Sequence, residues 1–283
     1  MARFSVLLFA GFAGVLAAQH GGADNQPFPA YKIIGNVYYV GASDITSYLI
    51  TTPAGHILIN SGYEDTPPLI RESIVKLGFK PSDVKILLNG QAHGDHVAGQ
   101  LAMQKMTGAK IYSSRPEVAV LESGGKADPR WGREQTYPAV KVDHVVRDLE
   151  AVTLGGTTLI AHMTPGHSIG CTTWTLRVAD GGKTYDVVIV GGTTINPGVE
   201  FVRKPTYPGI AGDYAKTFQT LRALPCDIFL GAHGGYYGMK EKYEKMKAGA
   251  AANPFLDPQG YRAFIDRSDQ TFQKQLAREK AAN

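Results

Sequence analysis

The chain has 283 residues, of which 43% are hydrophobic and 19% are charged, and its formal net charge is +4. These proportions are typical of a globular protein with a sizeable core and exclude a disordered chain. No basic run is interleaved with aromatic residues, so nucleic acid is not an expected partner.

The N-terminal 18 residues differ from the rest of the chain. Arg3 gives a positive start, residues 6–16 are apolar apart from glycines, and the small residues Ala17 and Ala18 follow. This pattern predicts a secretory signal peptide over residues 1–18, with an uncleaved membrane anchor as the alternative. No later stretch is long and apolar enough to cross a bilayer. We therefore expect a secreted, periplasmic protein that is free of the membrane after cleavage.

In the first half of the remaining chain, β-branched and aromatic residues predict strands at 31–40, 46–51 and 56–60, followed by a helix at about 66–77. An apolar strand at 84–88 precedes a polar loop and a helix that ends at about residue 106. A strand at 110–113 and a short helical turn at 117–121 come next. Residues 126–139 are polar and predict a long surface loop, and long ordered loops are often functional.

The second half repeats this order in weaker form. Strands are predicted at 145–149, 151–154, 157–162, 172–178, 185–190 and 227–230, with helices at 212–223 and from Pro258 onward. No segment has the composition of a linker between domains. Two β-rich halves with interleaved helices predict one α/β domain over residues 19–283, built from two packed sheets with helices outside.

The loop after the strand at 84–88 carries four potential metal ligands within six residues: Gln91, His93, Asp95 and His96. Zinc accepts such nitrogen and oxygen donors in tetrahedral or five-coordinate sites. The alternative is a polar loop whose histidines only cap the following helix. The density of ligand types favours a metal site.

Two further histidines, His167 and His233, each follow an apolar strand on a glycine-containing loop. If these strands are neighbours, the three loops converge on one sheet edge, and rigid element ends are where a metal site needs its ligands. Loop histidines without a metal are the alternative. Six donors exceed the three protein ligands of one catalytic zinc, so two zinc ions with open positions are expected. The other histidines are expected to be solvated or structural: His20, His56, His144 and His162.

The chain has two cysteines, Cys171 and Cys226. We interpret both as small hydrophobic residues, with a disulfide between them as the alternative in an oxidising compartment. A closed structural zinc site favours four thiolate or imidazole ligands, and two distant cysteines do not supply such a set.

The motif Gln91-x-His93-x-Asp95-His96 resembles the ligand motif of the metallo-β-lactamase superfamily. The segments 164–174, 224–233 and 252–257 are similar to its subclass 3 enzymes, and the resemblance covers nearly the whole mature chain. It implies an αββα sandwich of two mixed sheets with helices on the outer faces and the site at one edge. It also implies one zinc held by Gln91, His93 and His167, and a second held by Asp95, His96 and His233.

For activity, the resemblance implies an exported β-lactamase. Its substrate would be a small-molecule β-lactam, attacked by a zinc-held hydroxide at a centre that includes His93, Asp95 and His96. Thr193 and Asn196 would contact the substrate or the metal-held water, or they are plain turn residues. We expect a monomer. The alternatives are another hydrolase of the same fold, such as a lactonase or other esterase, and a periplasmic zinc-binding protein with weakened catalysis.

The sequence departs from the common pattern of the superfamily at several positions. Gln91 stands in place of a histidine, and because an amide oxygen is a neutral and weaker donor, the first zinc site should bind less tightly. Gly192 stands where relatives that hydrolyse other bonds carry a metal-bridging aspartate, which favours β-lactam hydrolysis. Asn60 replaces a frequent aspartate and is expected to hydrogen-bond near the site. Cys226 lacks the partner that some relatives have near Tyr261, so that disulfide is not expected.

Overall fold

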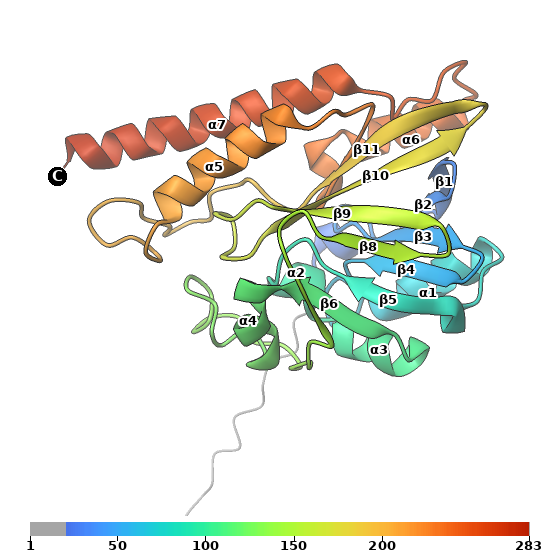
Figure 1. The fold of residues 1–283 in the computed structure, drawn as a ribbon, viewed down its shortest axis with the longest axis horizontal. Helices are drawn as coiled ribbons and strands as arrows, with labels where there is room; N and C mark the ends of the chain where they lie inside the picture. Colours follow the sequence, from blue (N-terminus) through green and yellow to red (C-terminus); the bar gives the residue numbers. More distant parts are fainter. Residues whose placement is uncertain (1–20, 283) are drawn as a thin grey trace, which may run out of the picture.

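A computed structural model of the chain describes residues 21–282, so the predicted signal peptide and His20 lie outside the described residues. Within them, two mixed β-sheets pack against each other (Figure 1). The first sheet has its strands in chain order, antiparallel from β1 to β4 and parallel from β4 to β7. Its strands are β1 (Tyr31–Ile34), β2 (Val37–Tyr39), β3 (Tyr48–Thr52), β4 (Gly55–Ile59), β5 (Val84–Leu88), β6 (Lys110–Ser114) and β7 (His144–Val146).

The second sheet has the order β12-β11-β10-β9-β8. β11 and β12 pair in parallel, and the remaining pairs are antiparallel. Its strands are β8 (Ala151–Leu154), β9 (Thr157–Met163), β10 (Thr172–Asp180), β11 (Lys183–Val190) and β12 (Ile228–Gly231).

Helices cover the outer faces of both sheets. The first sheet carries α1 (Pro67–Lys76), α2 (Gly94–Val97), α3 (Gln100–Thr107) and α4 (Val118–Glu122). The second half supplies α5 (Ile210–Ala223), α6 (Met239–Lys247) and α7 (Pro258–Ala281). In Figure 1, α5 and α7 lie together above the second sheet, while α3 lies below the first. This is the αββα sandwich that the resemblance implies, and the fold prediction is confirmed.

The alternation of side chains along the strands explains why both faces of the first sheet are covered. On β4, Ile57 and Ile59 belong to the core that contains the second sheet, while Leu58 belongs to the core beneath α1 and α3. All three side chains are fully buried. Burial of each such side chain stabilises the fold by roughly 1.5–3 kcal/mol, so a strand that is apolar on both faces requires layers on both sides.

The structure corrects two element predictions and adds one helix. The strand predicted at 145–149 ends at Val146, and Leu149 has a φ of 61°, which an extended strand does not allow. The helix predicted after the ligand loop is divided into α2 and α3, because the Gly99 amide donates to the Gly62 carbonyl at 3.0 Å instead of to a carbonyl of the preceding turn. Helix α6 was not predicted, since its sequence is dominated by lysine and glutamate rather than by an apolar stripe.

The remaining structural expectations concern the cysteines, the long loop and the membrane. Cys171 is buried, Cys226 is half-buried, and both are free thiols, as the preferred interpretation has it. Residues 126–139 form turns and irregular backbone, but Tyr137 within them is buried and its hydroxyl donates to the Ala92 carbonyl at 2.6 Å. Over residues 21–282, none of the helices combines the length and hydropathy that a bilayer crossing requires.

Candidate metal centre

The candidate ligands come from loops that follow β5, β9 and β12. These strand ends meet because Gly90, after β5, accepts a backbone hydrogen bond from Thr172 at 2.7 Å, while β11 pairs with both β10 and β12. Asn60 Oδ1 accepts a hydrogen bond from the Gly90 amide at 3.0 Å, which confirms that Asn60 supports this region. Its φ of 63° is left-handed, a conformation that asparagine tolerates better than most residues.

The first group of candidate ligands, called here the glutamine half-site, comprises Gln91, His93 and His167. The rings of His93 and His167 face each other with their centroids 4.8 Å apart. His93 Nε2 lies 3.5 Å from Asp128 Oδ2, and His167 Nδ1 donates to the Thr194 carbonyl at 2.7 Å. One nitrogen of each ring is therefore held by an oxygen, and the other nitrogen is left for a metal, as is usual for ligating histidines.

Gln91 is fully buried, and its two amide atoms differ in their contacts. Nε2 donates to the Gly191 carbonyl at 2.9 Å. Oε1 has no hydrogen-bond partner among residues 21–282, although a buried polar atom normally has one. An unpartnered amide oxygen beside two imidazoles is suited to a metal ion, so the donor set fits the zinc that the sequence predicts.

The second group, called here the aspartate half-site, comprises Asp95, His96 and His233, and one ligand atom from each lies within 4.8 Å of the others. Asp95 Oδ2 is 3.1 Å from His96 Nε2 and 3.6 Å from His233 Nε2. Donor atoms around a tetrahedral zinc are about 3.3 Å apart, given zinc–ligand distances of about 2.0–2.1 Å. The spacing of these three atoms therefore fits a zinc ion.

His233 is oriented by Asp44, which lies on the loop between β2 and β3. Asp44 Oδ2 contacts His233 Nδ1 at 3.0 Å, and its Oδ1 accepts from the Gly235 amide at 2.7 Å. Burial works to lower the pKa of His233, but the carboxylates of Asp44 and Asp95 outweigh it and raise that pKa above its usual value. Asp44 thus has the same role in the aspartate half-site that Asp128 has beside His93.

Electrostatics favour ionised aspartate and neutral His167 in the centre. Burial alone would raise the pKa of Asp95, but the imidazoles of His96 and His233 hold it well below its usual range. Burial, followed by the nearby charge of His93, lowers the pKa of His167 to about 3. A carboxylate and a neutral imidazole are the forms that bind metal ions.

Gly192 lies at the end of β11 against the glutamine half-site. A Cβ at this position would lie 2.5 Å from Cδ2 of His167 and 3.2 Å from Nε2 of Gln91. A side chain of any size here would displace the His167 ring. The close packing leaves no room for an aspartate side chain at this position.

A cleft of about 430 Å³ opens over both half-sites. The long loop contributes Trp131 and Gln135 to its wall, and Asn196 lines it as well. Arg130 Nε donates to the Pro197 carbonyl at 2.6 Å, which ties the long loop to the loop after β11. Thr193 does not line this cleft; its hydroxyl donates to Ser268 Oγ on α7 at 3.1 Å.

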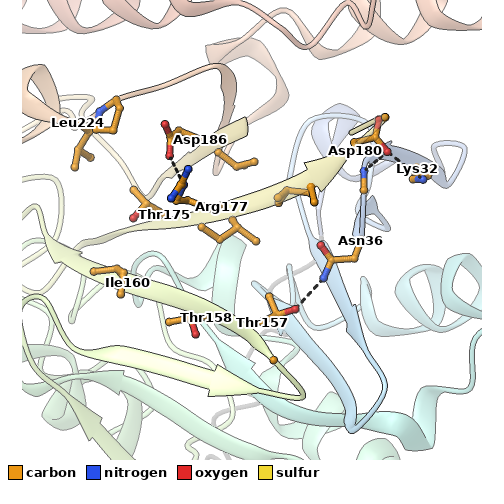
Figure 2. A pocket seen from close by; sticks show the side chains of 18 of the residues that line it. Lys32, Asn36, Thr157, Thr158, Ile160, Thr175, Arg177, Asp180, Asp186 and Leu224 are labelled. Carbon is orange, nitrogen blue, oxygen red and sulfur yellow. Dashed lines mark hydrogen bonds and ion pairs between the residues drawn. The ribbon is translucent and has the colours of Figure 1, made fainter. Parts of the chain in front are cut away.

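A larger hollow lies elsewhere and measures about 1040 Å³. Figure 2 shows it along β9, β10 and β11, beside the turn between β1 and β2. Its labelled charges pair with one another: Lys32 lies 3.7 Å from Asp180, and Arg177 lies 3.6 Å from Asp186. None of the candidate metal ligands lines it, so the smaller cleft, where the unpartnered donors converge, is the candidate functional site.

The structure thus brings together all six predicted ligands, and it separates Thr193 from Asn196. It also adds Asp44 and Asp128, which sequence reasoning missed. Each is an isolated aspartate on a loop, distant in sequence from the histidine it contacts, and no local pattern marks it. Asp128 lies in the long loop, and the length of that loop is the one sequence signal that indicates a function there.

Comparison with known proteins decides the family. A model described as the metallo-beta-lactamase superfamily matches residues 40–233, which is more than half of the chain. The chain belongs to the metallo-beta-lactamase superfamily.

Several solved structures of this superfamily are similar over most of their length. The FEZ-1 metallo-beta-lactamase from Legionella gormanii is 46% identical, with a TM-score of 0.89, covering 90% of this chain and 98% of that one. BJP-1 from Bradyrhizobium japonicum, a subclass B3 enzyme, is 39% identical with a TM-score of 0.84, covering 92% and 97%. LRA-12, a class B3 di-zinc enzyme from an Alaskan soil metagenome, is 32% identical with a TM-score of 0.82, covering 93% and 100%. The expectation of a hydrolase of the metallo-beta-lactamase type is confirmed at this level.

Proposed function

We propose that this chain is an exported zinc-dependent β-lactamase that hydrolyses the β-lactam amide bond. The observation that carries the proposal is the convergence of six donors in two half-sites, with an unpartnered amide oxygen at Gln91. Four of the six line one cleft: His93, Asp95, His167 and His233. The similar structures support the substrate class, since FEZ-1, BJP-1 and LRA-12 are all metallo-beta-lactamases, and LRA-12 is described as a di-zinc enzyme.

In this proposal, Gln91, His93 and His167 hold one zinc, and Asp95, His96 and His233 hold the other. Zinc, when bound, lowers the pKa of a water molecule to near neutrality and polarises a carbonyl oxygen. Asp44 and Asp128 keep one nitrogen of His233 and of His93 engaged, and so direct the other nitrogen of each ring toward the cleft.

The other residues of the cleft bind and orient the substrate. Asn196 offers an amide donor at the wall, within the same cleft as the ligands. Tyr63, Trp131 and Tyr236 present aromatic surface that contacts the substrate and excludes water from it. Asp95 remains ionised because its pKa is held low, so its carboxylate accepts a hydrogen bond from a water molecule and orients it toward the scissile carbonyl.

The activity is tested by assaying zinc-loaded protein on a penicillin, a cephalosporin and a carbapenem, with and without a chelator. We expect at least one of these three β-lactams to be hydrolysed, and we expect the chelator to abolish this hydrolysis. A lactone series run in parallel tests the esterase alternative. Higher catalytic efficiency on lactones than on every β-lactam would assign the protein to that alternative, and zinc binding without turnover would leave only a metal-binding role.

Export is a separate part of the proposal and rests on residues 1–18. Expression of the full chain in a Gram-negative bacterium, followed by fractionation and N-terminal sequencing, tests it. The expected product is a periplasmic protein that lacks these residues. Recovery of the intact N-terminus in the cytoplasm would contradict export without affecting the activity.

A further inference from the structure

A second hollow of about 430 Å³ adjoins the metal cleft. The two share Thr194, Gly235 and Tyr236, so these residues form the wall between them. The ring of Tyr236 lies between His233, at a centroid distance of 5.2 Å, and Phe264 of α7, at 4.9 Å. A molecule bound over the metals can therefore extend past Tyr236 into this hollow, here called the α7 subsite.

The α7 subsite has a single charged residue, Arg267, and no carboxylate lines it. Arg267 is exposed, and no carboxylate of residues 21–282 forms an ion pair with it. The two aspartates nearest to it in sequence, Asp266 and Asp269, are bound to Arg222 at 3.2 and 2.7 Å. The positive charge of Arg267 is thus left for a ligand.

The rest of the lining adds hydroxyl groups. Thr193, Ser268 and Thr271 line the hollow together with Arg267. The Thr193 hydroxyl donates to Ser268 Oγ at 3.1 Å and the Thr271 hydroxyl donates to the Arg267 carbonyl at 2.9 Å, so the Ser268 hydroxyl is the one left to donate to a ligand. The guanidinium group of arginine binds a carboxylate through two parallel hydrogen bonds, and a free hydroxyl such as that of Ser268 donates to a remaining lone pair. The chemistry of the hollow is that of a carboxylate site.

We propose that the α7 subsite binds a carboxylate on a substituent of the substrate, with Arg267 as the residue that selects it. The proposal rests on the proposed function and defines its preferred substrate class as β-lactams whose side chain carries an additional acid. The hollow lies beyond Tyr236, away from the metal ligands, so it receives a substituent and not the reacting ring.

Two penicillins that differ only by a carboxylate on the acyl side chain, benzylpenicillin and its α-carboxy derivative, provide the test. The ratio of their kcat/KM values is measured for zinc-loaded wild-type protein and for Arg267→Ala. Loss of a charge-assisted hydrogen-bonded pair predicts a fall of about tenfold in this ratio, carried by KM of the carboxylated compound. Arg267→Lys, which keeps the charge but loses the paired geometry, should recover part of it. Arg278→Ala, an exposed arginine of the same helix, is the matched control and should leave the ratio unchanged.

Binding of the same two compounds to the chelator-treated full chain, in which no turnover occurs, keeps this proposal separate from the proposed function. A preference for the carboxylated compound that Arg267→Ala abolishes supports the α7 subsite, even if neither compound is hydrolysed. Equal binding of both compounds to the wild-type chain, or a preference that survives Arg267→Ala, overturns the subsite and leaves the β-lactamase proposal standing.

Discussion

The glutamine half-site and the aspartate half-site are built alike but differ in charge. In each, a histidine is held by a supporting aspartate: Asp128 contacts His93 at 3.5 Å, and Asp44 contacts His233 at 3.0 Å. The third donor differs, since one half-site contributes the neutral amide of Gln91 and the other contributes the carboxylate of Asp95. The comparison separates two functions of aspartate at a metal centre, which are to orient an imidazole and to neutralise the ion.

The difference predicts unequal metal affinity. Two neutral imidazoles and an amide place no formal charge next to a zinc ion in the glutamine half-site. The aspartate half-site places one negative charge there, at a position that is only partly exposed and therefore weakly screened. We expect the aspartate half-site to bind zinc first and more tightly.

Removing the carboxylate of Asp95 should have the largest effect on the difference in zinc affinity between the half-sites. Asp95→Asn keeps the side-chain size and removes the charge, so we expect kcat/KM to fall by about a thousandfold or more, because the tight zinc is lost. Steady-state hydrolysis and zinc content after dialysis check this together. Glu241→Gln, an exposed carboxylate on α6, is the control. An Asp95→Asn protein that retains both zinc and activity would contradict the assignment.

The two supporting aspartates allow a matched test of the half-sites. Removal of a carboxylate that orients a ligating histidine costs about 10- to 100-fold in metal affinity. Asp44→Ala should therefore weaken the tighter zinc, and Asp128→Ala the weaker one. Competition with a chromophoric chelator measures the zinc affinity of both binding steps. If each variant changed both steps equally, the two half-sites would not be independent.

Gly192 tests the packing of the glutamine half-site without changing a ligand. In Gly192→Ala the new methyl group meets the His167 ring, so we expect weaker binding of the zinc in the glutamine half-site and a loss of about 1–3 kcal/mol in the free energy of unfolding. Gly212→Ala on α5, where a Cβ meets no atom within 4 Å, should instead be stabilising by about 0.4–1 kcal/mol. Urea denaturation distinguishes the two, and a harmless Gly192→Ala would show that the His167 ring has room to move.

The substitution with the smallest expected effect is Gln91→His, which should reduce the difference in zinc affinity between the half-sites. Gln91→His replaces the amide with a stronger donor and should raise the affinity of the weaker zinc by about tenfold. The gain is limited because the hydrogen bond from Gln91 to the Gly191 carbonyl is lost. Calorimetric zinc titration measures this gain in affinity. If the affinity of the weaker zinc were unchanged in Gln91→His, position 91 would contribute no ligand.

The sequence predicted the parts of this site that local patterns encode. The ligand motif and the strand-end histidines were recognisable because residue spacing and apolar strands are properties of a short segment. Asp44 and Asp128 were not, since they reach His233 and His93 only through the tertiary fold. The same holds for Arg267, whose importance depends on the pairing of Asp266 with Arg222. Thr193 and Asn196 were predicted together, but backbone geometry after β11 sends the Thr193 side chain toward α7.

Helix α6 and the short β7 show the same limit for the fold. A helix with mostly charged residues gives no apolar period, and the left-handed Leu149 that follows β7 is set by a turn in which its amide donates to the Ala161 carbonyl at 2.7 Å. The layers of helices outside the two packed sheets were predictable, because a strand that is apolar on both faces requires another element packed against each face.

Stepwise zinc titration of the metal-free wild-type protein, with Asp95→Asn and Gln91→His in parallel, tests the inequality of the two half-sites most directly. We expect two resolved binding steps in the wild type, loss of the tighter step in Asp95→Asn, and strengthening of only the weaker step in Gln91→His. A single step with two equal zinc ions, or a tighter step that responds to Gln91→His and not to Asp95→Asn, would contradict it.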